Sequence, residues 1–324
     1  MSKLETVAIV GVGRAGLQHA RAASAIGLRV TAFSSLSESS QRAQAFSQEF
    51  PLARRVDLSD GSLSESADLL VLALPPEVTH DVVLRLAQDS RQLLVEKPLA
   101  LSTSRVKAIA KVAEGNGCKV TVGYNRRVYP AVRRLREVLA SDPPRTAEVT
   151  VVEDIDFMMR TKGASSKAAY LRHGASTHML DLSNFLFGLQ NLTNVRPTLS
   201  NIEDGFVDYT FSSVGATGVH VQVSIDAGDR SRRGIRVVTS SGRVLALAPL
   251  EHFRMETPGD SMGSAEGLDR LEFDYPISFV ESFTTQMQLI MEDRTEDLHG
   301  IDDSLKLSEI VDGLELASEE LRHE

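Results

Sequence analysis

The sequence predicts an α/β protein with two domains. The first would hold a doubly wound parallel sheet, and the second would be an α+β domain with a large, mostly antiparallel open sheet. In the first 123 residues, short apolar runs alternate with helical patterns; from about residue 145, β-rich runs follow one another with few helices. Continuous apolar runs joined by helices indicate buried parallel strands, whereas alternating runs between turn residues indicate antiparallel ones. A length of 324 residues also favours two cores.

Five apolar runs in the first half predict strands: VAIVGV, RVTAF, DLLVLAL, QLLVE and KVTV. The helices expected between them cover residues 15–26, 38–50, 77–87 and 102–114. Ser102 suits the N-cap of the last helix, and Gly115 and Gly117 suit its end.

Six β-rich runs predict the strands of the second half: TAEVTVVEDI, GFVDYTFSS, GVHVQVSIDA, GIRVVTSS, GRVLALAPL and DRLEFDYP. Only two helices are expected there, over residues 178–187 and 302–322. The change of period places the boundary near Gly123, which gives domains 1–123 and 124–324. Because the open sheet would expose alternating apolar residues, we expect it to form a homodimer or homotetramer.

Charge and composition favour a cytoplasmic protein that binds neither nucleic acid nor membrane. The net charge is −9, and no stretch approaches the ~20 apolar residues of a membrane helix. The start, MSKLET, does not resemble a signal peptide. The single cysteine, Cys118, excludes an intrachain disulfide and a multi-cysteine metal site, and no metal is expected. Its apolar neighbours predict a buried, inert thiol.

Gly11, Gly13 and Gly16 form a G-x-G-x-x-G pattern between a predicted strand and a predicted helix. Such glycines allow a tight turn, a close approach to a pyrophosphate and close packing of helix on strand. The helix N-terminus, with Arg14 and Ala15, would face the phosphates. The alternative is a glycine turn without ligand, but the βαβ series favours a Rossmann-type dinucleotide site.

The end of the second strand bears on the choice between NADP and NAD. An NAD site usually carries a carboxylate there for the ribose hydroxyls, but this chain has Ser34 and Ser35, with Glu38 the nearest acid and Arg42 the nearest base. Two serines would not repel a 2′-phosphate and can donate hydrogen bonds to it. We therefore favour NADP, while a site that accepts either cofactor stays open.

Three further segments, in this order, are LALPPEVTH at residues 72–80, VEKPLA at 95–100 and GYNRRVYP at 123–130. With the glycine turn they resemble the Gfo/Idh/MocA oxidoreductase family, and the resemblance spans nearly the whole chain. It implies a nicotinamide cofactor, whose further contacts would be Leu74, Pro75, Pro76, His80, Glu96, Lys97 and Asn125.

Lys97 follows a predicted parallel strand, at the sheet edge where open α/β folds bind ligands. There it can donate to a substrate oxygen or relay its proton, and Pro98 after it can hold a rigid turn with a cis bond. A solvated lysine in a helix-entry turn is the alternative.

The family's Asp-x-Gly-x-His-x-x-Asp segment matches residues 174–181 in part, with His178 and Asp181 on one face of a helix. His178 would exchange the alcohol proton, oriented by Asp181; a pair that only stabilises the helix start is the alternative. Gly174 replaces the family's first Asp and Ser176 its glycine, and His173 is a candidate substitute. This departure implies either a different substrate and proton relay or a protein without turnover.

Substrate contacts are expected from Tyr124, Arg126, Arg172, His173 and His178, and basic residues nearby include Arg127, Arg160, Lys162 and Lys167. Arginines would suit a carboxylate or phosphate on a sugar, although charged loop residues are more often solvated. The resemblance thus implies hydride transfer between NADP or NAD and a secondary alcohol or ketone of a sugar, sugar derivative or cyclitol, bound between the cofactor and the second domain. A dinucleotide-binding sensor without catalysis and an NAD-dependent glycosidase are the alternatives.

Overall fold

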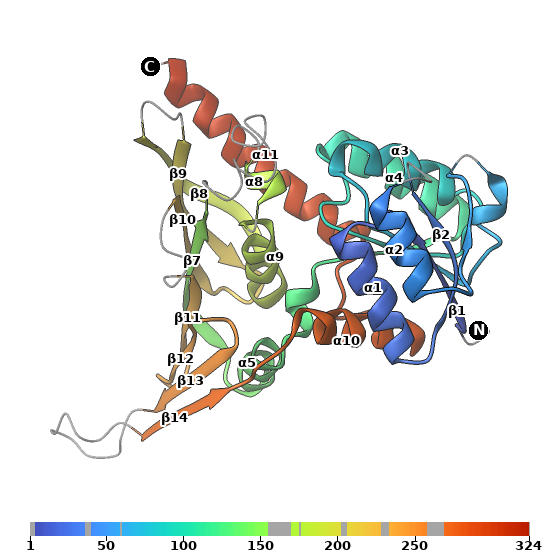
Figure 1. The fold of residues 1–324 in the computed structure, drawn as a ribbon. Helices are drawn as coiled ribbons and strands as arrows, with labels where there is room; N and C mark the ends of the chain where they lie inside the picture. Colours follow the sequence, from blue (N-terminus) through green and yellow to red (C-terminus); the bar gives the residue numbers. More distant parts are fainter. Residues whose placement is uncertain are drawn as a thin grey trace, which may run out of the picture. The chain divides into compact units, whose positions relative to one another are not determined.

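The computed structural model describes residues 4–35, 40–58, 60–154, 170–174, 176–201, 206–227, 233–257 and 269–323. The chain forms two compact units (Figure 1). The first contains Met1–Val128 and Ser278–Ser308, and the second contains Tyr129–Ile277 and Glu309–Glu324.

This division differs from the expected domains 1–123 and 124–324, because a segment near the C-terminus returns to the first unit. Its helix α10 (Phe279–Met291) buries Phe283, Met287 and Ile290 in the core that contains β1 and α1. A single cut in the sequence therefore does not separate the two units.

The first unit contains a six-stranded parallel sheet with the order β3-β2-β1-β4-β5-β6. The parallel sheet is confirmed, and β3 is a sixth strand beyond the five that the sequence predicted. Its strands are β1 (Thr6–Val10), β2 (Arg29–Ser34), β3 (Arg54–Arg55), β4 (Leu69–Leu72), β5 (Gln92–Val95) and β6 (Lys119–Val122). All residues of β4 and β5 are buried, which explains why all of β4 and residues 93–95 of β5 are apolar. The strand order reverses between β1 and β4, and open α/β sheets bind ligands at such a point.

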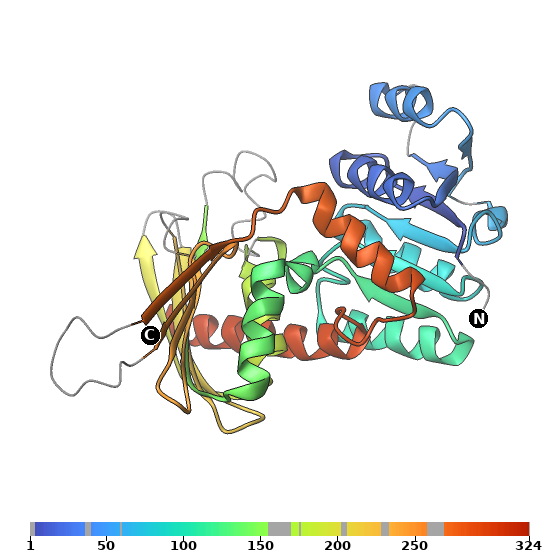
Figure 2. The same cartoon turned by 90° about the horizontal axis from the view of Figure 1, so that it is seen from below.

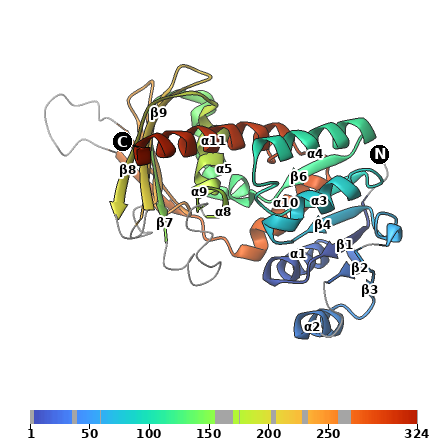
Figure 3. The ribbon, with the colours of Figure 1, turned by 90° about the horizontal axis from the view of Figure 1, so that it is seen from above.

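Helices cover both faces of this sheet (Figure 3). They are α1 (Arg14–Ala25), α2 (Gln41–Glu49), α3 (Pro76–Leu86) and α4 (Thr103–Asn116), with the 3-10 turns η1 (Gly61–Leu63) and η2 (Asn125–Val128). The helices α1 and α2 lie on one side and α3 and α4 on the other, and α10 packs along α1. Ser102 caps α4 and Gly117 ends it at a φ of +64°, as predicted.

The second unit contains an eight-stranded sheet with the order β14-β13-β12-β11-β7-β10-β9-β8. The neighbours β7 and β10 are parallel, and the other pairs are antiparallel. The strands are β7 (Pro144–Glu153), β8 (Leu189–Asn201), β9 (Phe206–Gly215), β10 (His220–Ala227), β11 (Gly234–Thr239), β12 (Val244–Leu247), β13 (His252–Thr257) and β14 (Asp269–Asp274). The mostly antiparallel open sheet is confirmed.

Two helices of the second unit, α5 (Pro130–Ser141) and α9 (Ser176–Phe187), lie against one face of this sheet (Figures 1 and 2). The short helix α8 (Tyr170–His173) precedes α9, and α11 (Ile301–His323) ends the described chain. The sequence did not predict α5 or α10, or the strands β8 and β13.

The exposed positions of this sheet bear on the expected exposure of alternating apolar residues. Residues that alternate with the buried ones include Glu148, Gln222 and Arg236. The Nη1 of Arg236 lies 3.7 Å from the Oε2 of Glu148 on the neighbouring strand. On these central strands the apolar half of each alternation is buried, as Val149 and Val237 show, whereas Leu271 and Phe273 of β14 are exposed.

Cys118 is buried, as predicted, and burial raises the pKa of its thiol to about 11. The thiol is therefore protonated and unreactive near neutral pH. Among the helices of the described residues, none combines the length and apolar character that a membrane span requires.

Candidate dinucleotide and catalytic site

The glycine turn between β1 and α1 is fixed by close packing. Gly11 has a φ of +94°, and a Cβ added there would lie 2.4 Å from the carbonyl oxygen of Ala73. A Cβ on Gly16 would lie 1.9 Å from the carbonyl oxygen of Gly11. Both distances are shorter than any van der Waals contact, so only glycine fits at either position.

The N-terminus of α1 has the features of an anion site. Its N-cap is Gly13, no side chain caps it, and its first turn carries no acidic residue. In the part of the chain that the structure describes, a Cβ on Gly13 would meet no atom within 4 Å, so this side of the turn is open there. Free N–H groups and the positive end of the helix dipole favour a phosphate here. Arg14 is exposed and Ala15 half-buried beside this turn, and the residues fit the pyrophosphate of a dinucleotide.

At the end of β2, a basic side chain stands where NAD sites usually carry an acid. Ser34 is buried, and the Nε of Arg55 lies 3.4 Å from the Oγ of Ser35. The Nη2 of Arg55 also donates to the carbonyl oxygen of Ser35, at 3.3 Å. Arg55 reaches this position from β3, which pairs with β2 at Phe33. The sequence suggested Arg42, which is exposed on α2, and missed Arg55 because β3 has only two residues.

The Pro-Pro segment forms the entry to α3. Leu74 precedes Pro75, the N-cap of the helix, and Pro76 occupies its first position. The Nδ1 of His80 donates to the Oδ1 of Asp81 at 2.8 Å, while its Nε2 is buried and has no partner among the described residues. An unsatisfied buried nitrogen is compatible with a ligand at this edge of the sheet.

Glu96 directly follows β5, and Lys97 comes next, with a cis peptide bond to Pro98 after it. The carboxylate of Glu96 contacts His19, a residue of α1 that the sequence analysis did not single out; their Oε1 and Nε2 atoms are 2.8 Å apart. Because β1, β2, β4 and β5 are parallel, the glycine turn, the two serines, the Pro-Pro segment and Lys97 all lie at one edge of the sheet.

The GYNRR segment makes contacts inside the first unit. Tyr124 is 3% exposed and its ring centroid lies 4.2 Å from that of His299, so the observed contact is a packing contact. Asn125 donates to the Oγ of Ser282 at 2.8 Å. Arg126 is half-buried. The cofactor role of Asn125 and the substrate roles of Tyr124 and Arg126 stay predictions.

In the second unit, His178 is half-buried and Asp181 is buried on α9, three residues apart. The helix begins at Ser176, whose backbone N–H and hydroxyl both donate to the Oε1 of Glu153; the hydroxyl contact measures 2.6 Å. Glu153 is 3% exposed at the end of β7. Although Gly174 carries no side chain, a buried carboxylate therefore lies at the start of the helix that carries His178.

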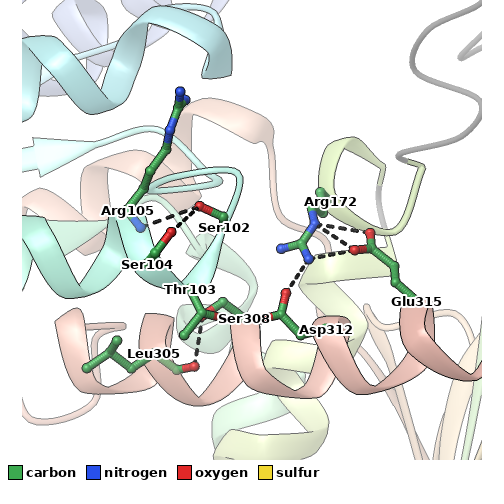
Figure 4. A network of polar contacts seen from close by, with 9 residues as sticks. All are labelled: Ser102, Thr103, Ser104, Arg105, Arg172, Leu305, Ser308, Asp312 and Glu315. Atoms are coloured by element: carbon green, nitrogen blue, oxygen red, sulfur yellow. Dashed lines mark hydrogen bonds and ion pairs between the residues drawn. The ribbon is translucent and has the colours of Figure 1, made fainter.

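Arg172 is held by two carboxylates of α11 (Figure 4). Its Nη2 lies 2.6 Å from Glu315 and also contacts Asp312. Burial alone would lower the pKa of Arg172, but the hydrogen bonds to Glu315 and Asp312 outweigh it and raise the pKa above its usual value. Its guanidinium is thus engaged within this unit, and its predicted role in substrate binding rests on the sequence alone.

Several of the predicted substrate residues lie outside the part of the chain that the structure describes. Arg160, Lys162 and Lys167 lie outside the described residues, and His173 is described only as the last backbone position of α8.

Residues 6–124 match a family model described as "Oxidoreductase family, NAD-binding Rossmann fold", GFO_IDH_MocA. The chain is 25% identical to an inositol 2-dehydrogenase from Rhizobium meliloti (strain 1021) over 72% of its own length, and 28% identical to a UDP-N-acetylglucosamine 3-dehydrogenase from Acidithiobacillus ferrooxidans over 45%. The matched segments span 65% and 49% of these two relatives.

Solved structures share the fold over nearly the whole chain. A structure of the UDP-N-acetylglucosamine 3-dehydrogenase from Acidithiobacillus ferrooxidans gives a TM-score of 0.78 at 17% identity, covering 98% of both chains. A structure of a super-repressor mutant of Gal80p from Saccharomyces cerevisiae gives 0.77 at 14% identity, covering 97% of this chain and 96% of that one.

Proposed function

We propose that this chain is an oxidoreductase of the Gfo/Idh/MocA type, whose family model matches residues 6–124, and that it transfers a hydride between a nicotinamide cofactor and a CH–OH group of a sugar, sugar derivative or cyclitol. The observation that carries this proposal is the open, uncapped N-terminus of α1 at the same sheet edge as Lys97. The names of the inositol and UDP-N-acetylglucosamine dehydrogenases support the substrate class.

In the proposed reaction, different residues of the chain bind the cofactor, polarise the substrate oxygen and transfer the proton. The backbone amides at the start of α1 bind the pyrophosphate, and the bound nicotinamide supplies the hydride acceptor or donor. Lys97 donates a hydrogen bond to the substrate oxygen. His178 takes or returns the hydroxyl proton, and Asp181 on the same helix orients it.

NADP is the cofactor we propose, rather than NAD. Arg55 and Ser35 together offer a guanidinium and a hydroxyl at the end of β2, and a 2′-phosphate attracts both groups. A guanidinium at this position would not strengthen the binding of NAD, because the ribose of NAD carries no phosphate there.

The test is turnover of a panel of inositols, free sugars and nucleotide sugars with NADP and NAD, followed by absorbance of the reduced cofactor. We expect Lys97→Ala and His178→Ala each to lower kcat by about 10²- to 10⁴-fold, the usual value of a general acid–base group. Lys107→Ala and His220→Ala remove exposed side chains of the same types and should leave kcat unchanged. Full activity of both site variants on a good substrate would refute the assignment.

A dinucleotide-binding sensor without turnover is the second candidate, and Gly174 is the observation that favours it. The buried carboxylate of Glu153 at the start of α9 supports catalysis instead, because the region retains an acidic group. Tight binding of NADP with no turnover across the panel would support the sensor.

We also propose that the chain works in the cytoplasm as a homodimer or homotetramer that uses the eight-stranded sheet. The single cysteine suits a reducing compartment.

A further inference from the structure

A buried histidine connects the dinucleotide helix to the segment that carries Lys97. His19 lies on α1 with no exposed surface. Its Nε2 is 2.8 Å from the Oε1 of Glu96, and its ring stacks on Phe283, with centroids 4.0 Å apart and planes inclined by 28°. Only an N–H can donate to a carboxylate, so Nε2 carries the proton of this hydrogen bond.

Glu96 is held on its other sides as well. Its Oε2 accepts the backbone N–H of Lys97 at 3.3 Å, and its own N–H donates to the carbonyl of Leu72 at 2.8 Å. A Cβ on Gly123 would lie 3.4 Å from the Cα, Cδ and Oε1 of Glu96, so the neighbouring backbone packs directly on this side chain. The carboxylate therefore bridges the ring of His19 and the backbone of Lys97.

We propose that His19 is a positioning residue for Lys97, which acts through Glu96. This inference rests on the proposed function, since it assigns the purpose of the contact to the reaction. His19 belongs to the helix whose N-terminus would bind the pyrophosphate, so the same rigid element that fixes the cofactor fixes the turn that carries the catalytic lysine. The Nδ1 of His19 is buried without a partner among the described residues, so Glu96 is the polar contact that orients the ring.

The first test compares His19→Gln with His19→Asn. The amide nitrogen of glutamine can occupy the position of Nε2, whereas that of asparagine falls near Nδ1 and cannot reach Glu96. Both variants lose the stacking on Phe283, so they form a matched pair. We expect His19→Asn to lower kcat by about 10²-fold, the scale of a misplaced catalytic group, with KM for NADP changed less than twofold. His19→Gln should recover most of the rate.

The second measurement does not depend on turnover. The chain has eight lysines, so ¹⁵N-lysine labelling gives a simple amide spectrum, in which Lys97→Arg identifies the Lys97 signal. We expect this amide to shift in His19→Asn and in Glu96→Gln, and to stay near its wild-type position in His19→Gln.

The two readouts separate the proposal from the function it rests on. If no substrate turns over but the Lys97 amide responds as described, the positioning contact stands and the proposed reaction is wrong. If the amide does not respond to His19→Asn, or if His19→Gln and His19→Asn lose kcat equally in a protein that still binds NADP, His19 is not a positioning residue.

Discussion

At the end of β2, the guanidinium of Arg55 lies within 3.4 Å of Ser35, where a carboxylate would select the free ribose of NAD. Replacing it by glutamine should weaken NADP binding by about 10- to 100-fold, because a charge-assisted hydrogen bond contributes about 1.5–3 kcal/mol. The affinity for NAD should change little, since its ribose carries no charge there.

Titration calorimetry with each cofactor measures both affinities in Arg55→Gln. Arg54→Gln is the matched control, because Arg54 precedes it on β3 and is exposed. A parallel loss of NADP and NAD affinity in Arg55→Gln would show that the arginine supports the fold of this edge and does not select the phosphate.

Single residues differ in how far the sequence reveals them. Gly11 and Gly16 could be predicted because their constraint is local: the pattern, the strand and the helix are contiguous. His19 could not, because its partner is 77 residues away and a histidine in a helix carries no signal of what it meets. Arg55 depends likewise on the pairing of β2 with β3, which no local pattern specifies.

The junction between α5 and the β11–β12 turn depends on a buried carboxylate. Asp142, the C-cap of α5, is 7% exposed and accepts the hydroxyl of Thr239 at 2.7 Å and the backbone N–H of Ser241 at 3.1 Å. Burial raises the pKa of Asp142, but the hydrogen bonds from Ser241 and Thr239 outweigh it and hold the pKa below its usual value of 3.8.

A folded-state pKa below the unfolded one means that the charged carboxylate stabilises the protein above about pH 4 and that this stabilisation is lost as the pH falls through the folded-state value. Asp142→Asn should therefore lower the free energy of unfolding by about 1–3 kcal/mol at neutral pH, and by less at about pH 3. Urea unfolding of both proteins at the two pH values measures this, with Glu309→Gln as an exposed control in the same unit. A difference that is the same at both pH values would contradict the prediction.

Elements were predictable where one periodicity ran unbroken between clear turn signals. Four helices and the parallel strands β1, β2, β4, β5 and β6 of the first unit have this property. The helix α10 does not, because FVESFTTQMQLIM is rich in residues that favour strands. Its capping box, formed by Ser278 and Glu281, was a readable signal, as was Pro130 at the first position of α5. The strand β8 carries too many polar residues to show alternation.

At the scale of the whole molecule, the sequence correctly indicates two structural units with different sheets, but it does not indicate which segments of the chain form each unit. The return of Ser278–Ser308 to the first unit depends on long-range packing, such as that of Phe283 on His19. A cut at Gly123 would therefore separate the first unit from one of its core helices.

Self-association is best argued from the end of the eight-stranded sheet. The outermost strand of the sheet is β14 (Figure 1). Its residues Leu271 and Phe273 are 47% and 46% exposed. Phe273 pairs with Phe253 of β13, which is buried, so these side chains extend the apolar side of the sheet to its edge. An exposed apolar edge strand favours association, and a second copy presents the same surface.

Light scattering after gel filtration should therefore show a dimer or larger species at micromolar concentration, and Phe273→Glu should shift it toward monomer, because association would bury the new charge without a partner. Leu52→Glu is the control: Leu52 is 91% exposed in the first unit, so its replacement should leave the species unchanged. A monomeric wild-type protein would contradict self-association altogether. An oligomer that survives Phe273→Glu would instead place the interface on the polar face that carries Glu148 and Arg236, whose charge reversal would then be the decisive variant.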